Sequence, residues 1–302
     1  MAGIILKQTL TMGLYMLMGL VLFRTGKLTK EGSRCIANML LWLILPVVII
    51  RSFLKPFTME NLGALGVSFL MGGLSYFVAM GLSWAIFRKK PLDCFACAFS
   101  NVGFMGVPLV TASFGAEAAF YLCGLVVFVN LFQWTWGASL LQKEKKPLSI
   151  RGMLLNPMFL ATAIGFVLFV TGLGNRLPSV VTGALSGVAA LNGPLAMVVL
   201  GVYLAQTELK TLVTRTQLYW VSLVRLLVIP AATMLVLALL PVSVDSRLIV
   251  LMGAAAPVGS NVAVYAQLYD SDYPYACQTV AHSTIISIAT IPLLLQLANV
   301  LF

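Results

Sequence analysis

The chain has 302 residues, of which 60% are hydrophobic and only 9% are charged, and its formal net charge is +10. With a mean hydropathy of +1.00, almost every segment would expose apolar surface in water, which excludes a soluble protein. The basic residues lie in short loops between apolar runs, which argues against a nucleic-acid-binding protein. We therefore expect an all-α integral membrane protein that is surrounded by the lipid bilayer.

Apolar segments long enough to cross a hydrocarbon core recur along the chain. In chain order we predict ten membrane-spanning helices, at residues 4–23, 33–54, 62–87, 92–115, 117–141, 153–173, 178–206, 216–240, 247–269 and 274–301. The loops after the odd-numbered helices hold most of the basic residues, namely Arg24, Lys27, Lys30, Arg34, Arg88, Lys89, Lys90, Lys143, Lys145, Lys146, Arg151, Lys210 and Arg215. The opposite side has Lys7, Arg51, Lys55, Arg176 and Arg247. Because basic loops stay on the cytoplasmic side, we expect both termini outside.

An odd number of helices in each half would make the second half enter the membrane from the opposite side. The prolines support such an inverted repeat, because three pairs are separated by 148, 150 and 149 residues: Pro46 and Pro194, Pro91 and Pro241, Pro108 and Pro257. Matched prolines predict matched kinks or breaks. We place the first five-helix repeat at residues 1–146 and the second, inverted one at residues 147–302.

Two segments rich in proline, glycine and asparagine interrupt the predicted fourth and ninth spans, at residues 100–109 and 257–269. Free backbone groups inside a membrane persist where protein encloses them or where they line a cavity, and the N-termini of half-helices attract anions. We therefore expect a substrate site formed by Asn101, Gly103, Pro108, Pro257, Ser260, Asn261 and Tyr265. The alternative is that the serines and asparagines only cap the breaks or join helices through hydrogen bonds.

Few ionisable side chains fall inside or beside the predicted spans. Asp270 is a candidate gate or proton site at the end of the ninth span, where a wet structural role is the alternative. Arg225 could bind a carboxylate or could extend to the surface as an anchor. His282, the only histidine, could couple protons to transport or serve as a hydrogen-bonded packing residue. Cys94 and Cys97 form a lone CxxC pair, so we expect neither a metal nor a cofactor.

Motifs along nearly the whole chain carry a resemblance to a known family: Leu45-Pro46, Asn101 through Pro108, Gly201 after Pro194, Ala256-Pro257 with Asn261, Ala266, Gln267 and Tyr269, and Ser283 through Pro292. They resemble the auxin efflux carrier family of bacterial and plant transporters, which shares its architecture with bile acid:sodium symporters. The resemblance implies that helices 4 and 9 cross near the membrane centre. It also implies a scaffold of helices 1, 2, 6 and 7 and a transport domain of helices 3–5 and 8–10. The short central loop is typical of a compact bacterial member in the cytoplasmic membrane.

The resemblance implies a secondary transporter that moves a small organic anion by alternating access. The substrate would be a mono- or dicarboxylate such as malonate or malate, or an auxin-like acid. The sequence holds no ATP-binding motif, so the membrane potential or protons would drive transport. A sodium-coupled symporter is the nearest alternative, and it is disfavoured because residues 257–266 contain no acidic side chain.

Three other classes of protein compete with a carrier. A channel or a non-transporting sensor stays open, whereas an intramembrane enzyme that uses Ser260 and His282 is disfavoured because GxSxG and HExxH motifs are missing from the sequence. The family's scaffold makes a homodimer a reasonable expectation. Gly183 and Gly187 form a small-residue face in the seventh span, for which packing inside the chain is the favoured interpretation and a second subunit the alternative.

Overall fold

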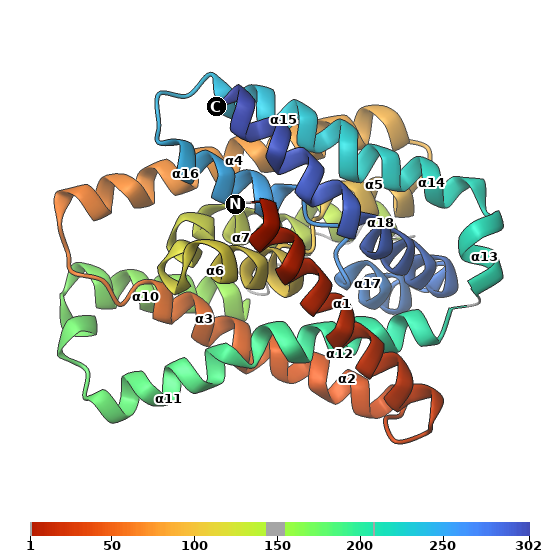
Figure 1. Ribbon diagram of the computed structural model, residues 1–302, viewed down its shortest axis with the longest axis horizontal. Coiled ribbons are helices and arrows are strands. Elements are labelled where there is room, and N and C mark those ends of the chain that lie inside the picture. The colour runs from red at the N-terminus through yellow and green to blue at the C-terminus, as the bar shows by residue number, and fades with distance from the viewer. Residues whose placement is uncertain (1, 143–154, 208) are drawn as a thin grey trace.

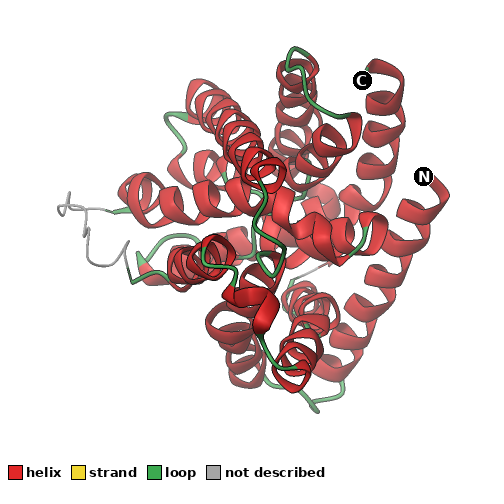
Figure 2. Cartoon of the chain, turned by 90° about the vertical axis from the view of Figure 1, so that its left-hand side faces the viewer, coloured by secondary structure: helices red, strands yellow, loops and turns green. Residues whose placement is uncertain are grey.

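The structure, a computed structural model, describes residues 2–142, 155–207 and 209–302, and these residues form helices and loops without a strand (Figures 1 and 2). The first half contains α1 (Ala2–Arg24), α2 (Lys30–Met39), η1 (Leu40–Ile44), α3 (Leu45–Ser52), α4 (Met59–Phe87), α5 (Pro91–Ala98), η2 (Val102–Gly106), α6 (Val107–Phe114), η3 (Ala116–Ala118), α7 (Ala119–Phe132), η4 (Gln133–Gly137) and α8 (Ala138–Leu141). The second half contains α10 (Pro157–Val170), η5 (Leu173–Arg176), α11 (Ser179–Ala190), α12 (Asn192–Ala205), α13 (Leu209–Thr214), α14 (Thr216–Leu223), η6 (Val224–Val228), α15 (Ile229–Ala238), α16 (Val244–Ala254), α17 (Asn261–Leu268) and α18 (Tyr273–Leu301). The predicted all-α class is confirmed for the part of the chain that is described.

Helical segments lie in each of the ten ranges predicted from the sequence. Within the described residues, six continuous helical stretches are long and apolar enough to cross a membrane: Lys30–Ser52, Met59–Phe87, Ala116–Leu141, Ser179–Ala205, Thr216–Ala238 and Tyr273–Leu301. The inverted repeat stays a prediction. Its boundary at residues 146 and 147, and the predicted cytoplasmic residues Lys143, Lys145, Lys146 and Arg151, lie outside the described residues.

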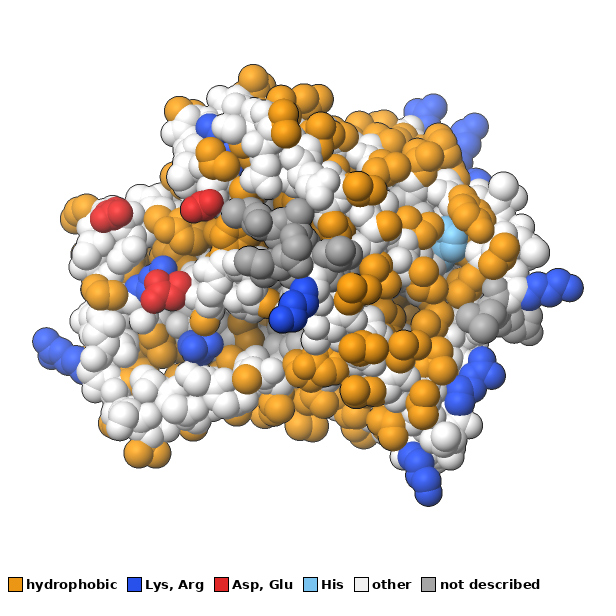
Figure 3. Space-filling model, in the orientation of Figure 1, with side chains coloured by type: hydrophobic (Ala, Val, Ile, Leu, Met, Phe, Trp, Pro, Cys, Tyr) orange, Lys and Arg blue, Asp and Glu red, His pale blue; other side chains and the backbone are white. Residues whose placement is uncertain are grey.

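The outer surface of the helices is apolar over much of its area (Figure 3). Large hydrophobic side chains such as Trp42, Leu239 and Val300 are 66%, 83% and 86% exposed. So much exposed apolar surface is unfavourable in water, but it is the expected lipid-facing surface of a membrane protein. Several basic side chains gather at the right-hand end of the molecule in Figure 3, away from the apolar middle.

Three wide π-helical turns each end two residues before a proline. They are η1 before Pro46, η2 before Pro108 and η6 before Pro230. Proline lacks an N–H and its ring collides with the carbonyl of the preceding turn, and a π turn inserts one extra residue at that point. Pro108 therefore stays inside a helix. The predicted irregularity at residues 100–109 is confined to the non-helical residues 99–101 and the π turn at residues 102–106, and regular α-helix begins at Val107.

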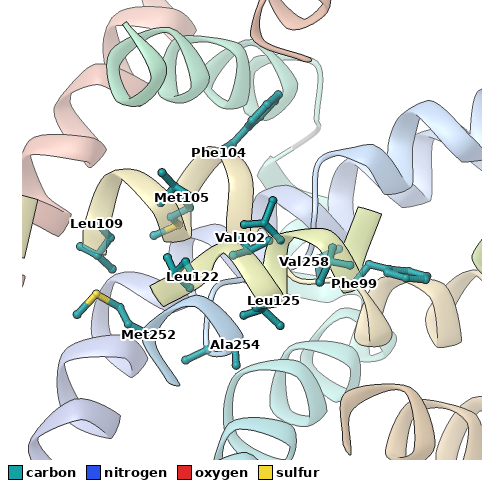
Figure 4. Packing of buried hydrophobic residues seen from close by; sticks show 14 of the residues in the cluster. Phe99, Val102, Phe104, Met105, Leu109, Leu122, Leu125, Met252, Ala254 and Val258 are labelled. Carbon is teal, nitrogen blue, oxygen red and sulfur yellow. The ribbon is translucent and has the colours of Figure 1, made fainter. Parts of the chain in front are cut away.

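The two broken segments, at the place predicted for the crossing, pair through their backbones. The amide of Asn101 donates to the carbonyl of Pro257 at 2.8 Å, and the amide of Gly259 donates to the carbonyl of Phe99 at 2.9 Å. Figure 4 shows Val258 next to Phe99 in this region. Unpaired backbone groups are costly in an apolar interior, so this antiparallel pairing stabilises both breaks at once. Gly259 fits here because a Cβ would lie 3.1 Å from the Phe99 carbonyl oxygen.

Glycines set the closest helix contacts elsewhere. A Cβ added to Gly201 of α12 would overlap the carbonyl of Met16 in α1, and one added to Gly124 of α7 would overlap backbone atoms of Ser68 in α4. Small residues allow helix backbones to approach in this way within membranes. Gly183 and Gly187 do not take part, because a Cβ on either would meet no other described atom within 4 Å. The expectation that they pack inside the chain is therefore wrong.

Candidate functional site

A small pocket lies at the crossing of the two breaks. It has a volume of about 30 Å³ and is lined mainly by residues of the two breaks and of the helix α7–η4 beside them: Ser100, Asn101, Gly103, Asn130, Gln133, Gly259, Ser260 and Asn261. This volume is close to the share that one water molecule takes in the liquid. Pockets that bind small organic molecules are roughly ten times larger, so in this conformation the space admits water and not a dicarboxylate.

Side-chain amides surround this pocket. The Nδ2 of Asn261 donates to the Oε1 of Gln133 at 2.9 Å, which joins α17 to η4. The Nδ2 of Asn101 is buried and has no hydrogen-bond partner among the described residues. A buried donor without a partner costs about 1–3 kcal/mol, so a hydrogen-bond acceptor at this place would be stabilised. The prediction that Asn101, Gly103, Ser260 and Asn261 lie together is consistent with this geometry; their binding of a substrate stays a prediction.

Two helices begin at the pocket. The carbonyl of Asn101 accepts from the amides of Met105 and Gly106, both at 3.0 Å, so that η2 and α6 start immediately after Asn101. The second helix, α17, starts at Asn261. The first amides of a helix have no partner within the helix, and the helix dipole places partial positive charge there. The pocket therefore lies at two helix N-termini and beside a free carboxamide donor, although the amides of Val262 and Ala263 in α17 already donate to the carbonyls of Gly259 and Ser260.

The C-terminal ends of the other two half-helices meet at Arg225. The guanidinium Nε donates to the carbonyl of Ala256 at 3.1 Å, Nη1 donates to the carbonyl of Cys97 at 2.9 Å, and Nη2 donates to the carbonyl of Ala254. Arg225 is only 1% exposed, so the expectation that it extends to the membrane surface as an anchor is wrong. It ties the end of α5 to the end of α16 and places a positive charge where two helix dipoles are negative.

The remaining predicted residues lie apart from the pocket. The Pro257 carbonyl takes part in the backbone pairing, and Tyr265 is buried against Phe95, with ring centroids 5.0 Å apart. His282 is buried, and its Nδ1 lies 2.8 Å from the Oγ of Ser222, an arrangement that suits a hydrogen-bonded packing residue. Asp270 is exposed in the turn after α17 and adopts a positive φ of 51°. None of these positions tests a role in gating or proton coupling.

A larger cavity lies on the other side of η2 and α6. Its volume is about 400 Å³, and it is bounded by α1, α3, α6, α11 and the start of α12. Pro108 lines this cavity and not the crossing pocket, whereas Gly103 lines the crossing pocket. The Nδ2 of Asn192 donates to the carbonyl of Gly103 at 3.2 Å, so this contact lies between the two spaces. The predicted site residues are thus divided between two neighbouring spaces.

Several polar residues of this region were not singled out in the sequence. Asn130, Gln133 and Asn192 are isolated amides inside long apolar spans, and that isolation is the signal that could have found them. Asp93 is the only buried acidic side chain of the described residues. It accepts from the hydroxyl of Tyr275 at 2.6 Å and from Nε2 of Gln217 at 2.5 Å, which joins α5, α14 and α18.

Comparison with known proteins places these features in a family. The family model described as "Membrane transport protein" matches residues 4–295. A relative named "Putative malonate transporter" from Rhizobium meliloti (strain 1021) is 24% identical over 249 residues, which cover 78% of this chain and 76% of the relative. The predicted resemblance to auxin efflux carriers is confirmed, and the chain belongs to the family of membrane transport proteins.

Proposed function

We propose that the protein is a secondary carrier that moves a small mono- or dicarboxylate across the bacterial cytoplasmic membrane. The observation that supports this best is the crossing pocket, where two helix N-termini and the unpartnered Nδ2 of Asn101 offer donors and positive potential without an acidic side chain in the lining. The name of the malonate relative agrees with a substrate of this class. Malonate, malate and auxin-like acids are the candidates to compare. Family membership favours transport over catalysis.

The mechanism that we propose is alternating access. The scaffold would consist of the first, second, sixth and seventh helical ranges, and the transport domain would consist of the others and would carry the crossing. The pocket of about 30 Å³ must widen before it can hold a carboxylate, so substrate binding would be linked to a change in the crossing. Both termini would lie outside. Efflux of an anion would gain about 2.3 kcal/mol per charge for each 100 mV of membrane potential, and uptake would need protons or another ion.

Sodium coupling is the main alternative within this fold. A sodium site needs several oxygen ligands, and the carbonyls at the ends of α5 and α16 are natural candidates. Three of these carbonyls already accept hydrogen bonds from Arg225. We therefore propose a carrier that does not require sodium. A non-transporting sensor would bind the same acids without flux, and a channel would give flux far above the rate of a carrier.

Uptake of labelled malonate, malate and an aromatic acid into proteoliposomes tests the proposal, at set pH, membrane potential and sodium concentration. We expect saturable flux of at least one acid that follows potential or pH and is unchanged when potassium replaces sodium. Asn101→Ala should reduce this flux at least about tenfold, whereas Asn175→Ala, at an exposed position in η5, should leave it unchanged. If no acid moves, the carrier assignment is wrong; if flux requires sodium, the symporter is correct.

We also propose a homodimer in the membrane. In support, α11 has no buried residue, and Gly183 and Gly187 have open space beside them. Two helices that meet through small residues can approach closely in a bilayer. Crosslinking of Gly183→Cys in native membranes should give a dimer, and Gly81→Cys in α4, which also has open space beside it, is the control. Equal crosslinking at both positions would argue against α11 as the interface.

A further inference from the structure

The cavity of about 400 Å³ beside α6 has a composition that the crossing pocket does not share. Its polar lining comes from five elements and holds one formal charge: Gln8, Tyr15, Arg51, Ser52, Thr111, Ser186 and Asn192. The volume is ample for a small organic acid, which the crossing pocket cannot hold in this conformation.

Arg51 supplies that charge. It is half-buried in the last turn of α3, and within the described residues it has no acidic partner within 4.0 Å. On the same predicted side, Glu117 is paired with Lys55 at 3.0 Å, and its side chain is 82% exposed. A guanidinium that faces a cavity without a counter-charge presents a planar set of donors that matches a carboxylate.

Asn192 supplies a hydrogen-bond acceptor, whereas Arg51 supplies donors. Its Nδ2 donates to the Gly103 carbonyl, and its Oδ1 is buried without a partner among the described residues. The amide cannot be turned round to satisfy both atoms, because the Gly103 carbonyl can only accept. A buried acceptor in this position is stabilised by a ligand that brings a hydroxyl or a protonated carboxyl group. Asn192 and Arg51 line the same cavity, so one ligand could use both.

We infer that this cavity is a binding site for a small organic acid with two functional groups: a carboxylate that pairs with Arg51 and a hydrogen-bond donor, either hydroxyl or protonated carboxyl, that pairs with Asn192 Oδ1. The inference rests on the proposed function and adds a preference for acids that carry a second polar group. Malate and hydrogen malonate carry both groups, whereas acetate carries only the carboxylate. The site is separate from the Asn101 pocket, because the Asn192–Gly103 hydrogen bond lies between them.

Uptake kinetics in proteoliposomes test this site, with malate, malonate and acetate as labelled substrates. Arg51→Gln should raise the KM for each acid at least about tenfold and leave the maximal rate nearly unchanged, and Arg51→Lys should give a smaller rise. The matched control is Arg176→Gln, at an exposed position on the same predicted side. Asn192→Ala should reduce the preference for malate over acetate, which a purely structural residue would not change.

Binding of malate to the purified full chain in detergent separates this inference from the proposed function. If wild-type protein transports acids but Arg51→Gln and Arg176→Gln have equal KM values, the Arg51 site is wrong and the carrier stands. If wild-type protein transports no acid but binds malate in an Arg51-dependent way, the site stands and the carrier is wrong. Absence of both binding and flux would overturn both. Arg51→Lys keeps the charge and serves as the folded variant if Arg51→Gln does not purify.

Discussion

Replacing Arg225 by methionine removes a guanidinium from the junction of two half-helices while it keeps a long, apolar side chain. Three buried carbonyls, those of Cys97, Ala254 and Ala256, would lose their donor. Each unsatisfied acceptor costs about 1–3 kcal/mol, and the loss of a positive charge beside two helix C-termini adds to this. Because the variant no longer buries a charge, it avoids a desolvation cost of several kcal/mol. The net loss in the free energy of unfolding is therefore about 3–5 kcal/mol.

The assay is thermal unfolding of the detergent-purified protein. One kcal/mol shifts Tm by about 2–4 °C in chains of moderate size, so Arg225→Met should lower Tm by at least about 6 °C. Arg225→Lys keeps the charge but has fewer hydrogen-bond donors, all on one nitrogen. Its Tm should lie between those of Arg225→Met and the wild type. Arg88→Met, at an exposed loop position, is the control. A Tm for Arg225→Met within about 1 °C of wild type would refute the idea that Arg225 holds the junction together.

Three further predictions concern other contacts. Gln133→Ala and Asn261→Ala should each reduce carboxylate uptake. Because the two amides are hydrogen-bonded at 2.9 Å, the double variant should lose less uptake than the sum of the two single losses. Strictly additive losses in the uptake assay would show that the contact has no role. Asp93→Asn should destabilise the protein by about 1–3 kcal/mol in denaturation experiments, because it weakens two charge-assisted hydrogen bonds, and an unchanged midpoint would contradict this. Gly201→Val should prevent normal folding, judged by the yield of monodisperse protein, whereas Gly183→Val should be tolerated; equal yields would contradict the α1–α12 contact.

Much of the fold could be predicted from apolar segment lengths, because each segment must satisfy its own backbone within lipid. The helical ranges follow from this constraint alone. The exact place of the first break does not, because Pro108 and its neighbouring glycines suggest an irregular segment while a π turn keeps them helical. The outcome depends on whether one extra residue can be inserted before the proline, and that is decided by tertiary packing and not by local propensity.

The candidate site likewise has residues that the sequence could predict and contacts that it could not. Asn101, Ser260 and Asn261 could be predicted because polar side chains beside helix breaks stand out in an apolar sequence. Arg225 was recognised as unusual, but its role could not be derived, since its three acceptors are backbone carbonyls that leave no mark in the sequence. Asn192 and Arg51 belong to different spans, and the sequence does not show that the fold places both on one cavity.

The two ends of each broken helix have different partners, and this difference bears on the proposed binding of an anion. At the C-terminal ends of α5 and α16, a fixed guanidinium neutralises the negative ends of two dipoles. At the N-terminal ends of η2 and α17, no described acidic side chain lines the pocket, although the amides of Val262 and Ala263 already donate to the carbonyls of Gly259 and Ser260. Under the proposed function, this arrangement would stabilise a bound carboxylate and would disfavour a sodium ion at the same place.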